Sequence, residues 1–158
     1  MPSFEQDFIK SKGMSIKYKD VELIGADRIP VQKKFSGALK LISTNSEWRQ
    51  AMCLAALDGK LSIFSQKEKR FIVWADDLKD EVLHFEGVSK SSQLLVYNAW
   101  ENIAWNNMPF TNFWTHGAAM IVEVNGNTRR YRCNDGHPDD NFDDIIFEVT
   151  IDEPNAIL

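Results

Sequence analysis

A short acidic segment, residues 134–144, is the part of the chain best suited to bind an ion. Hard side-chain oxygens on an irregular loop suit Ca²⁺, which takes about 6–8 oxygen ligands from carboxylates, amides, backbone carbonyls and water. The sequence therefore predicts a Ca²⁺ site here, and the alternative is an acidic turn whose Asp side chains make local turn and capping hydrogen bonds. The candidate ligands are Asn134, Asp135, Asp139, Asp140, Asn141, Asp143 and Asp144.

The charge distribution supports a cation at this segment. From residue 134 to the C-terminus the chain has eight acidic residues and no Lys or Arg, whereas the rest has 15 acidic and 18 basic residues. Like charges crowded on a short loop repel each other unless something neutralises them. The spacing does not match an EF-hand, and His137 as the only nearby imidazole argues against zinc or manganese.

A second unusual stretch, residues 97–117, combines aromatic rings with side-chain amides and holds three of the five tryptophans. Flat rings suit the apolar face of a sugar, and amides suit its hydroxyls. The same residue types suit a membrane headgroup region or a protein partner, and a loop folded over the core is the remaining interpretation. The candidate ligand-binding residues are Trp100, Trp105, Asn106, Asn107, Trp114 and His116.

Strands must position both segments. Residues 118–124, 128–133 and 145–151 each divide into two alternating sets, one of them mostly apolar, which is the period of a strand with one buried face. Asn125-Gly126 predicts a tight hairpin turn, because both residues tolerate positive φ. The acidic segment is therefore expected to be the loop between the last two strands.

The rest of the chain also predicts short strands. Residues 16–23 indicate a strand pair or one bent strand, and residues 25–30 a loop. Residues 46–64 fit either a helix that begins at Ser46 or a hairpin across Asp58-Gly59, and the hairpin is favoured. Further strands are expected at residues 35–42, 71–74, 82–85 and 94–97.

Short strands separated by frequent turns are typical of a sandwich. We expect an all-β fold, a single-domain and mostly antiparallel β-sandwich over residues 14–158. Residues 1–13 are expected to form a mobile N-terminal arm with one helical turn around Phe4 and Phe8.

The end of the chain carries a family resemblance. Residues 141–149, with Asn141, Asp143-Asp144, Phe147 and Val149, resemble the ending of bacterial extracellular β-sandwich domains associated with calcium. The same region is similar to the final loop and strand of bacterial calcium-dependent galactose lectins. The similarity lies in Asn134-Asp135, Asp140-Asn141 and the last strand.

The resemblance implies a β-sandwich in which Asp135, Asp139 or Asp140, and Asp143 or Asp144 bind the ion. The chain departs from the lectin pattern in three places. Phe142 and Asp143 stand where the lectins prefer small or amide residues, and Ile145 stands where they have glycine.

Several classes of protein are disfavoured. No apolar run is long enough to predict a transmembrane helix, and the N-terminus has no signal-peptide core, so the chain is expected to be cytoplasmic, to leave without a signal, or to have lost a leader. Acidity without a basic face disfavours nucleic-acid binding. Cys53 and Cys133 are expected to be buried free thiols. No catalytic motif occurs, so no enzymatic activity is predicted.

The leading functional hypothesis is a non-enzymatic, lectin-like protein that binds carbohydrate in a Ca²⁺-dependent way. The alternatives are a toxin-like or pore-forming β-sandwich that binds membranes or cell surfaces through its aromatic stretch, and an interaction or immunity protein whose acidic tail contacts a basic partner.

Overall fold

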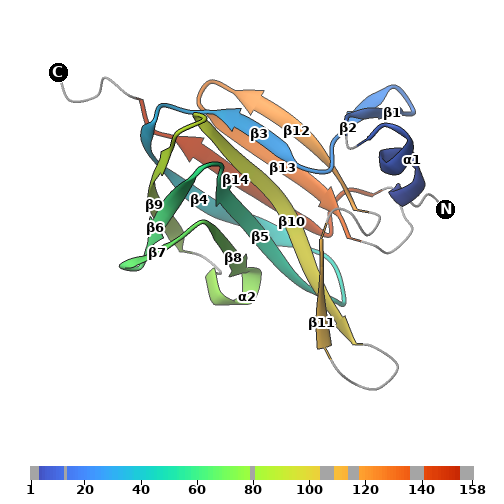
Figure 1. The fold of residues 1–158 in the computed structure, drawn as a ribbon. Coiled ribbons are helices and arrows are strands. Elements are labelled where there is room, and N and C mark those ends of the chain that lie inside the picture. The colour runs from blue at the N-terminus through green and yellow to red at the C-terminus, as the bar shows by residue number, and fades with distance from the viewer. Residues whose placement is uncertain are drawn as a thin grey trace.

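The protein is a two-layer sandwich of antiparallel sheets, which confirms the expected all-β fold (Figure 1). The computed structural model describes residues 4–12, 14–78, 81–103, 109–113, 118–135 and 141–153. A five-stranded sheet lies in front of a seven-stranded sheet in Figure 1, and a small hairpin with one helix lies at the right. Within the described residues, no helix is both long enough and apolar enough to cross a bilayer.

The seven-stranded sheet contains the last three strands of the chain as neighbours. Its pairings are all antiparallel, as the alternating sequence pattern predicts. Its order is β12 (Ala119–Asn125), β13 (Thr128–Asn134), β14 (Ile145–Ile151), β4 (Lys34–Thr44), β9 (Val82–Ser89), β6 (Gly59–Ile63) and β7 (Gln66–Glu68).

The five-stranded sheet is built on the long strand β10 (Gln93–Ile103). One edge of β10 pairs with β5 (Arg49–Ala56), which in turn pairs with β8 (Arg70–Trp74). The other edge pairs first with β3 (Asp27–Pro30) and then with β11 (Pro109–Phe113). The ribbon of β10 and β11 extends below the rest of the sandwich (Figure 1). Residues 27–30 are therefore a strand and not the expected loop, and a short strand, β7, precedes β8.

The core lies between the two sheets. Leu39, Phe85 and Phe147 of the larger sheet face Leu54 and Leu94 of the smaller one, and each is at most 2% exposed. Seven of the eight residues of β5 are buried, so this strand is covered on both faces. Its sequence is consequently a continuous apolar run, and the periodicity of such a run does not by itself distinguish a strand from a helix.

The favoured hairpin across Asp58-Gly59 is wrong, although both strands are present. β5 pairs with β8 and β10, whereas β6 pairs with β7 and β9, so the chain crosses between sheets at this turn. A Cβ on Gly59 would lie 1.8 Å from the carbonyl oxygen of Val88. The glycine thus marks a close approach of two backbones rather than a hairpin turn.

We expect Gly59→Asn to lower the free energy of unfolding by about 1–3 kcal/mol, because a backbone carbonyl cannot rotate away from the added atoms. The control is Gly126→Asn, since Gly126 has φ +64° with no atom near its missing Cβ, and Asn tolerates that conformation. Urea unfolding of both variants measures the difference. Equal stability of the two variants would contradict the close approach at Gly59.

The N-terminal segment is anchored to the sandwich. Helix α1 (Glu5–Lys10) follows Phe4, and both Phe4 and Phe8 are buried. β1 (Ile16–Tyr18) and β2 (Val21–Leu23) form the predicted strand pair, with positive φ at both turn residues. Phe4 and Phe8 pack with three further apolar residues from β2, β12 and the acidic segment: Leu23, Ala119 and Phe142. The start of the chain is therefore packed against the end of the acidic segment.

The hairpin before the acidic segment turns one residue later than predicted. Asn125 pairs with Thr128, so Gly126 and Asn127 are the two central residues, and only Gly126 has positive φ.

Helix α2 (Ala75–Leu78) is one turn long and follows β8. Cys53 and Cys133 are free and buried, as predicted, and burial raises the pKa of the Cys53 thiol to about 12.

Candidate functional site

The acidic segment connects β13 to β14 at one end of the sandwich. Asn134, Asp135 and Asp144 are 1%, 1% and 5% exposed, which is unusual for residues of this polarity. Asn141 is exposed and Asp143 is half-buried. Asp139 and Asp140 lie outside the described residues. The structure therefore brings together Asn134, Asp135 and Asp144 as a buried group of oxygens.

Hydrogen bonds hold the described part of this segment. The Asp144 carboxylate accepts a hydrogen bond from the backbone N–H of Asp135 at 2.9 Å, and Asn134 Oδ1 accepts one from the backbone N–H of Phe142 at 2.8 Å. Phe142 has a φ of 54°, which redirects the chain toward β14. The two bonds span nine and eight residues, so they join the two ends of the acidic segment rather than cap a local turn.

A second segment, the β4–β5 connection, contacts the acidic one. The Asp135 carboxylate accepts hydrogen bonds from Ser46 Oγ at 2.7 Å and from Gln50 Nε2 at 3.0 Å. Asn45 donates its backbone N–H to the Asp144 carbonyl and its side-chain amide to Asp143. The buried carboxylate is thus bound by donors that lie 85 and 89 residues earlier in the chain.

Two side-chain amides approach the same point from the five-stranded sheet. Gln50 on β5 is 3% exposed and Asn98 on β10 is completely buried. Asn98 donates to the Asn134 carbonyl oxygen at 2.9 Å, so both amides contact the Asn134–Asp135 pair. Their other atoms, Gln50 Oε1 and Asn98 Oδ1, are buried and accept no hydrogen bond from the residues that the structure describes. A buried acceptor without a donor costs about 1–3 kcal/mol, unless an ion or a bound donor satisfies it.

The oxygens at this end fit a hard cation. Carboxylate, amide and backbone oxygens are the ligands of Ca²⁺. The nearby Cys133 thiol is buried and its pKa lies well above its ordinary value, so it is held as the neutral thiol and not as a metal-binding thiolate. In the part of the chain that the structure describes, no three His, Cys, Asp or Glu residues group closely enough to hold a metal. A cation here would therefore need the amide oxygens.

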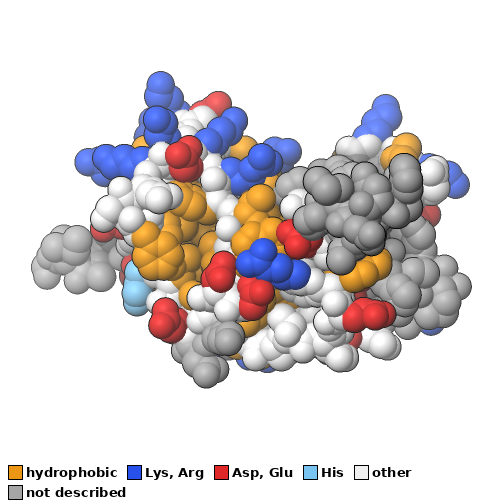
Figure 2. All heavy atoms as spheres, turned by 90° about the horizontal axis from the view of Figure 1, so that it is seen from below, with side chains coloured by type: hydrophobic (Ala, Val, Ile, Leu, Met, Phe, Trp, Pro, Cys, Tyr) orange, Lys and Arg blue, Asp and Glu red, His pale blue; other side chains and the backbone are white. Residues whose placement is uncertain are grey.

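Arg49 precedes Gln50 in the chain, but its side chain contacts β8 and α2 instead of the acidic segment. Its Nε lies 3.0 Å from Asp76 Oδ2, and its guanidinium stacks over the Trp74 ring at 4.3 Å. Its exposed ion pairs with Asp76 and Asp77 raise the pKa of Arg49. Figure 2 shows hydrophobic side chains interleaved with acidic and basic ones at this lower end, where β8 and α2 lie.

Of the aromatic ligand-binding candidates, only Trp100 has a described side chain. It is 1% exposed, so its ring belongs to the core and presents no face to a ligand. In register it lies directly opposite Gln50. The other five candidates, Trp105, Asn106, Asn107, Trp114 and His116, lie outside the described residues.

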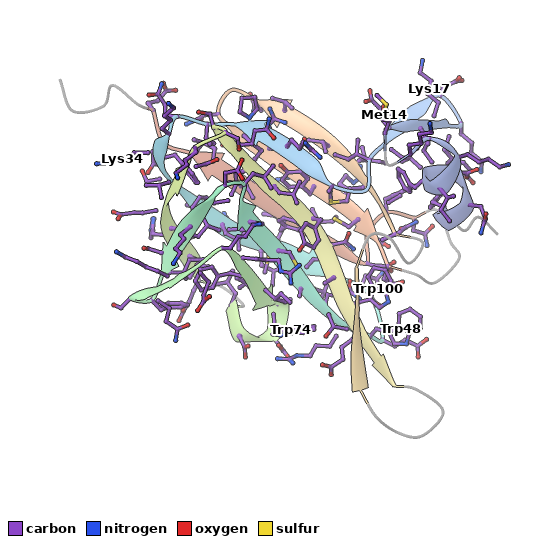
Figure 3. All side chains as sticks on the ribbon, in the orientation of Figure 1. Met14, Lys17, Lys34, Trp48, Trp74 and Trp100 are labelled. Atoms are coloured by element: carbon purple, nitrogen blue, oxygen red, sulfur yellow. The ribbon has the colours of Figure 1, made fainter. Side chains whose placement is uncertain are left out.

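Sequence reasoning missed four polar residues of this site: Asn45, Ser46, Gln50 and Asn98. A signal was present for the last two, because each is a polar residue in an otherwise apolar strand, and buried polar residues are informative. Trp48, also missed, is half-buried on the same connection, and Figure 3 shows Trp48 and Trp100 at the same end of the molecule.

Comparison of the chain with protein-family models, with curated proteins and with solved structures found no match.

Proposed function

We propose that this protein is a non-enzymatic binding domain that recognises carbohydrate in a Ca²⁺-dependent way at the end formed by the acidic segment. The observation that supports the cation is the pair of buried oxygens, Gln50 Oε1 and Asn98 Oδ1, beside the buried Asp135. Two neutral amide oxygens and a carboxylate at one place form a donor set that suits Ca²⁺.

The ion would act on recognition through the β4–β5 connection. Ser46 and Gln50 both donate to Asp135, and Ser46 Oγ accepts the backbone N–H of Trp48. A bound Ca²⁺ that has Asp135 among its ligands would therefore fix Ser46 and, through it, the backbone of Trp48. The described residues Tyr97, Asn98 and Trp100 of β10 are buried, so the ring that we propose for glycan contact is the half-buried Trp48.

Calorimetric titration of Ca²⁺ into chelator-treated protein tests the cation directly. We expect saturable heat, and a stabilisation of about 2.7 kcal/mol when Ca²⁺ exceeds its Kd a hundredfold. The double variant Gln50→Met and Asn98→Leu keeps the size of both side chains but removes both amide oxygens, and it should bind Ca²⁺ far more weakly. The control is Asn127→Leu, which removes an exposed amide that donates to the Ile151 carbonyl oxygen, outside the acidic segment.

The outcomes separate the two parts of the proposal. If wild-type protein shows neither heat nor a rise in melting temperature, the cation is ruled out. Glycan-array binding in Ca²⁺ and in EGTA then tests recognition. Ca²⁺ binding without any glycan whose binding is lost in EGTA would make the ion purely structural.

A further inference from the structure

A separate hollow lies on the outer face of the seven-stranded sheet. Its volume is about 1000 Å³, and its walls come from β4, β6 and β9, with the residues that follow β14 along one side. A smaller hollow of about 510 Å³ continues it and shares Ser36, Ser62, Glu86 and Asp152. Figure 3 shows Lys34, on the wall of the larger hollow, at the opposite end of the molecule from Trp48 and Trp100. The groove formed by the two hollows, here called the outer groove, is therefore distinct from the acidic segment.

The strand register sets the outer groove's side chains in rows. Lys34, Val88 and Lys60 lie opposite one another across β4, β9 and β6. The next row lies two residues further along β4, β9 and β6 and continues onto β7. It contains Ser36, Glu86, Ser62 and Lys67. Adjacent strands are about 4.7–4.9 Å apart, so a polar or charged group recurs at nearly every strand across the groove.

The charges of the outer groove indicate an uncharged ligand. The lining contains three lysines and three acidic residues, so it has no net charge: Lys34, Lys60, Lys67, Glu86, Asp152 and Glu153. Within the described residues, no ion pair is found for the three lysines or for Glu86. An anion or a cation would meet repulsion as well as attraction here. Hydroxyl groups both donate to carboxylates and accept from ammonium groups, so a polyhydroxylated neutral ligand satisfies both signs.

An exposed aromatic ring stands at the edge of the smaller hollow. Phe64 and Ser65 form the two-residue turn between β6 and β7, with φ values of 51° and 66°. Such turns favour Asn-Gly, and a bulky residue with positive φ is an outlier. Phe64 is nonetheless 78% exposed, so burial does not compensate for the strain. Strain held at an exposed aromatic residue indicates a contact with a ligand.

We propose that the outer groove binds a neutral oligosaccharide independently of Ca²⁺. Glu86 and Lys60 hydrogen-bond its hydroxyls, and the Phe64 ring stacks on the apolar face of one sugar unit. Because the groove and the acidic segment lie at opposite ends, this binding persists in EGTA and survives if the Ca²⁺ site proves absent.

The first test is an array of neutral and anionic oligosaccharides probed with the full chain in EGTA. We expect neutral glycans to bind, and their binding to be unchanged between about 0.05 M and 0.5 M salt, because no net charge is involved. Binding of anionic glycans alone, or binding lost at high salt, overturns the proposal in favour of an anion site. No neutral glycan bound in EGTA also overturns it.

Calorimetry with the strongest neutral binder then tests the residues. Glu86→Gln should weaken binding about tenfold or more, because a charge-assisted hydrogen bond is lost. Its matched control is Glu22→Gln, at an exposed position of β2 outside the groove. Lys60→Met is compared with Lys40→Met, an exposed lysine on the same sheet that does not line the groove. Equal affinities within each pair contradict the assignment.

The double variant Phe64→Asn and Ser65→Gly separates binding from folding. Asn-Gly fits the turn better than Phe-Ser, so the melting temperature should rise by about 2–4 °C. Affinity for the same oligosaccharide should fall about tenfold, because the stacking ring is gone. A variant that is stabilised and binds as well as wild type shows that Phe64 makes no contact.

Discussion

Replacing Asp27 with alanine is expected to lower the free energy of unfolding by about 3–4 kcal/mol. Asp27 lies on β3 of the smaller sheet, and its carboxylate accepts hydrogen bonds from Arg129 Nη1 at 2.9 Å and from the Tyr131 hydroxyl at 2.7 Å. Both partners come from β13 of the larger sheet. The carboxylate therefore links the two layers, and its side chain is only 13% exposed.

The cost comes mainly from what remains after the change. Arg129 would keep its charge at a site where its side chain is 25% exposed, and the completely buried Tyr131 would keep a hydroxyl without an acceptor. Asp27→Asn should cost about half as much, because the amide oxygen can still accept the Tyr131 proton. The Tyr131 ring stays packed in either variant, since it stacks on Phe147 at 5.1 Å.

Urea unfolding of Asp27→Ala, Tyr131→Phe and the double variant measures the coupling between the two side chains. The control is Glu148→Ala, because Glu148 pairs with Arg130 at 2.8 Å on the outer face, where an ion pair contributes about 0–1 kcal/mol. If Asp27→Ala is no more destabilising than Glu148→Ala, the link between the layers does not contribute to stability.

The last three strands were predictable because each carries local information. Buried residues alternate with more exposed ones over residues 130–133 of β13 and residues 145–150 of β14, and a glycine-containing turn separates β12 from β13. β5 could not be assigned in the same way, since burial on both faces removes the alternation. β3 is four residues long and is a strand only because β10 provides an edge for it.

The candidate site was only half predictable for a related reason. Asp135 and Asp144 stand out because acidic residues cluster in sequence, so the loop could be identified. The donors that hold Asp135 come from Ser46 and Gln50, and no local pattern connects residues so distant in sequence. The polar neighbours of Trp100 in the sequence predict a place on the contact surface. The strand register instead turns it inward opposite Gln50.

Alkaline pH is expected to destabilise the protein by about 5 kcal/mol between pH 9 and pH 11. Burial raises the pKa of Cys53 from its ordinary value of 9.0 to about 12 and raises that of Cys133 well above the same value. Burial, together with the nearby Asp27 carboxylate, also raises the pKa of Tyr131 above its ordinary value. All three groups are therefore neutral in the folded protein under these conditions.

The free energy of unfolding falls with rising pH because the unfolded chain loses protons before the folded protein does. Above pH 9 the unfolded chain releases the two thiol protons while the folded protein keeps them, so unfolding becomes more favourable as pH rises. Each such group contributes about 1.4 kcal/mol per pH unit, so the two thiols together give about 2.7 kcal/mol per unit. Below pH 9 their contribution is fully present and constant, and Tyr131 adds to the slope only above pH 10.

Urea unfolding at pH 8, 9, 10 and 11 measures this slope. The double variant Cys53→Ala and Cys133→Ala is the control, since it removes both thiols and should flatten the dependence between pH 9 and 10 almost completely. The variant starts from a lower stability because each alanine leaves a small cavity, so the slopes, and not the absolute values, are compared. A wild-type slope equal to that of the variant would show that the thiols titrate in the folded protein, which would contradict their complete burial.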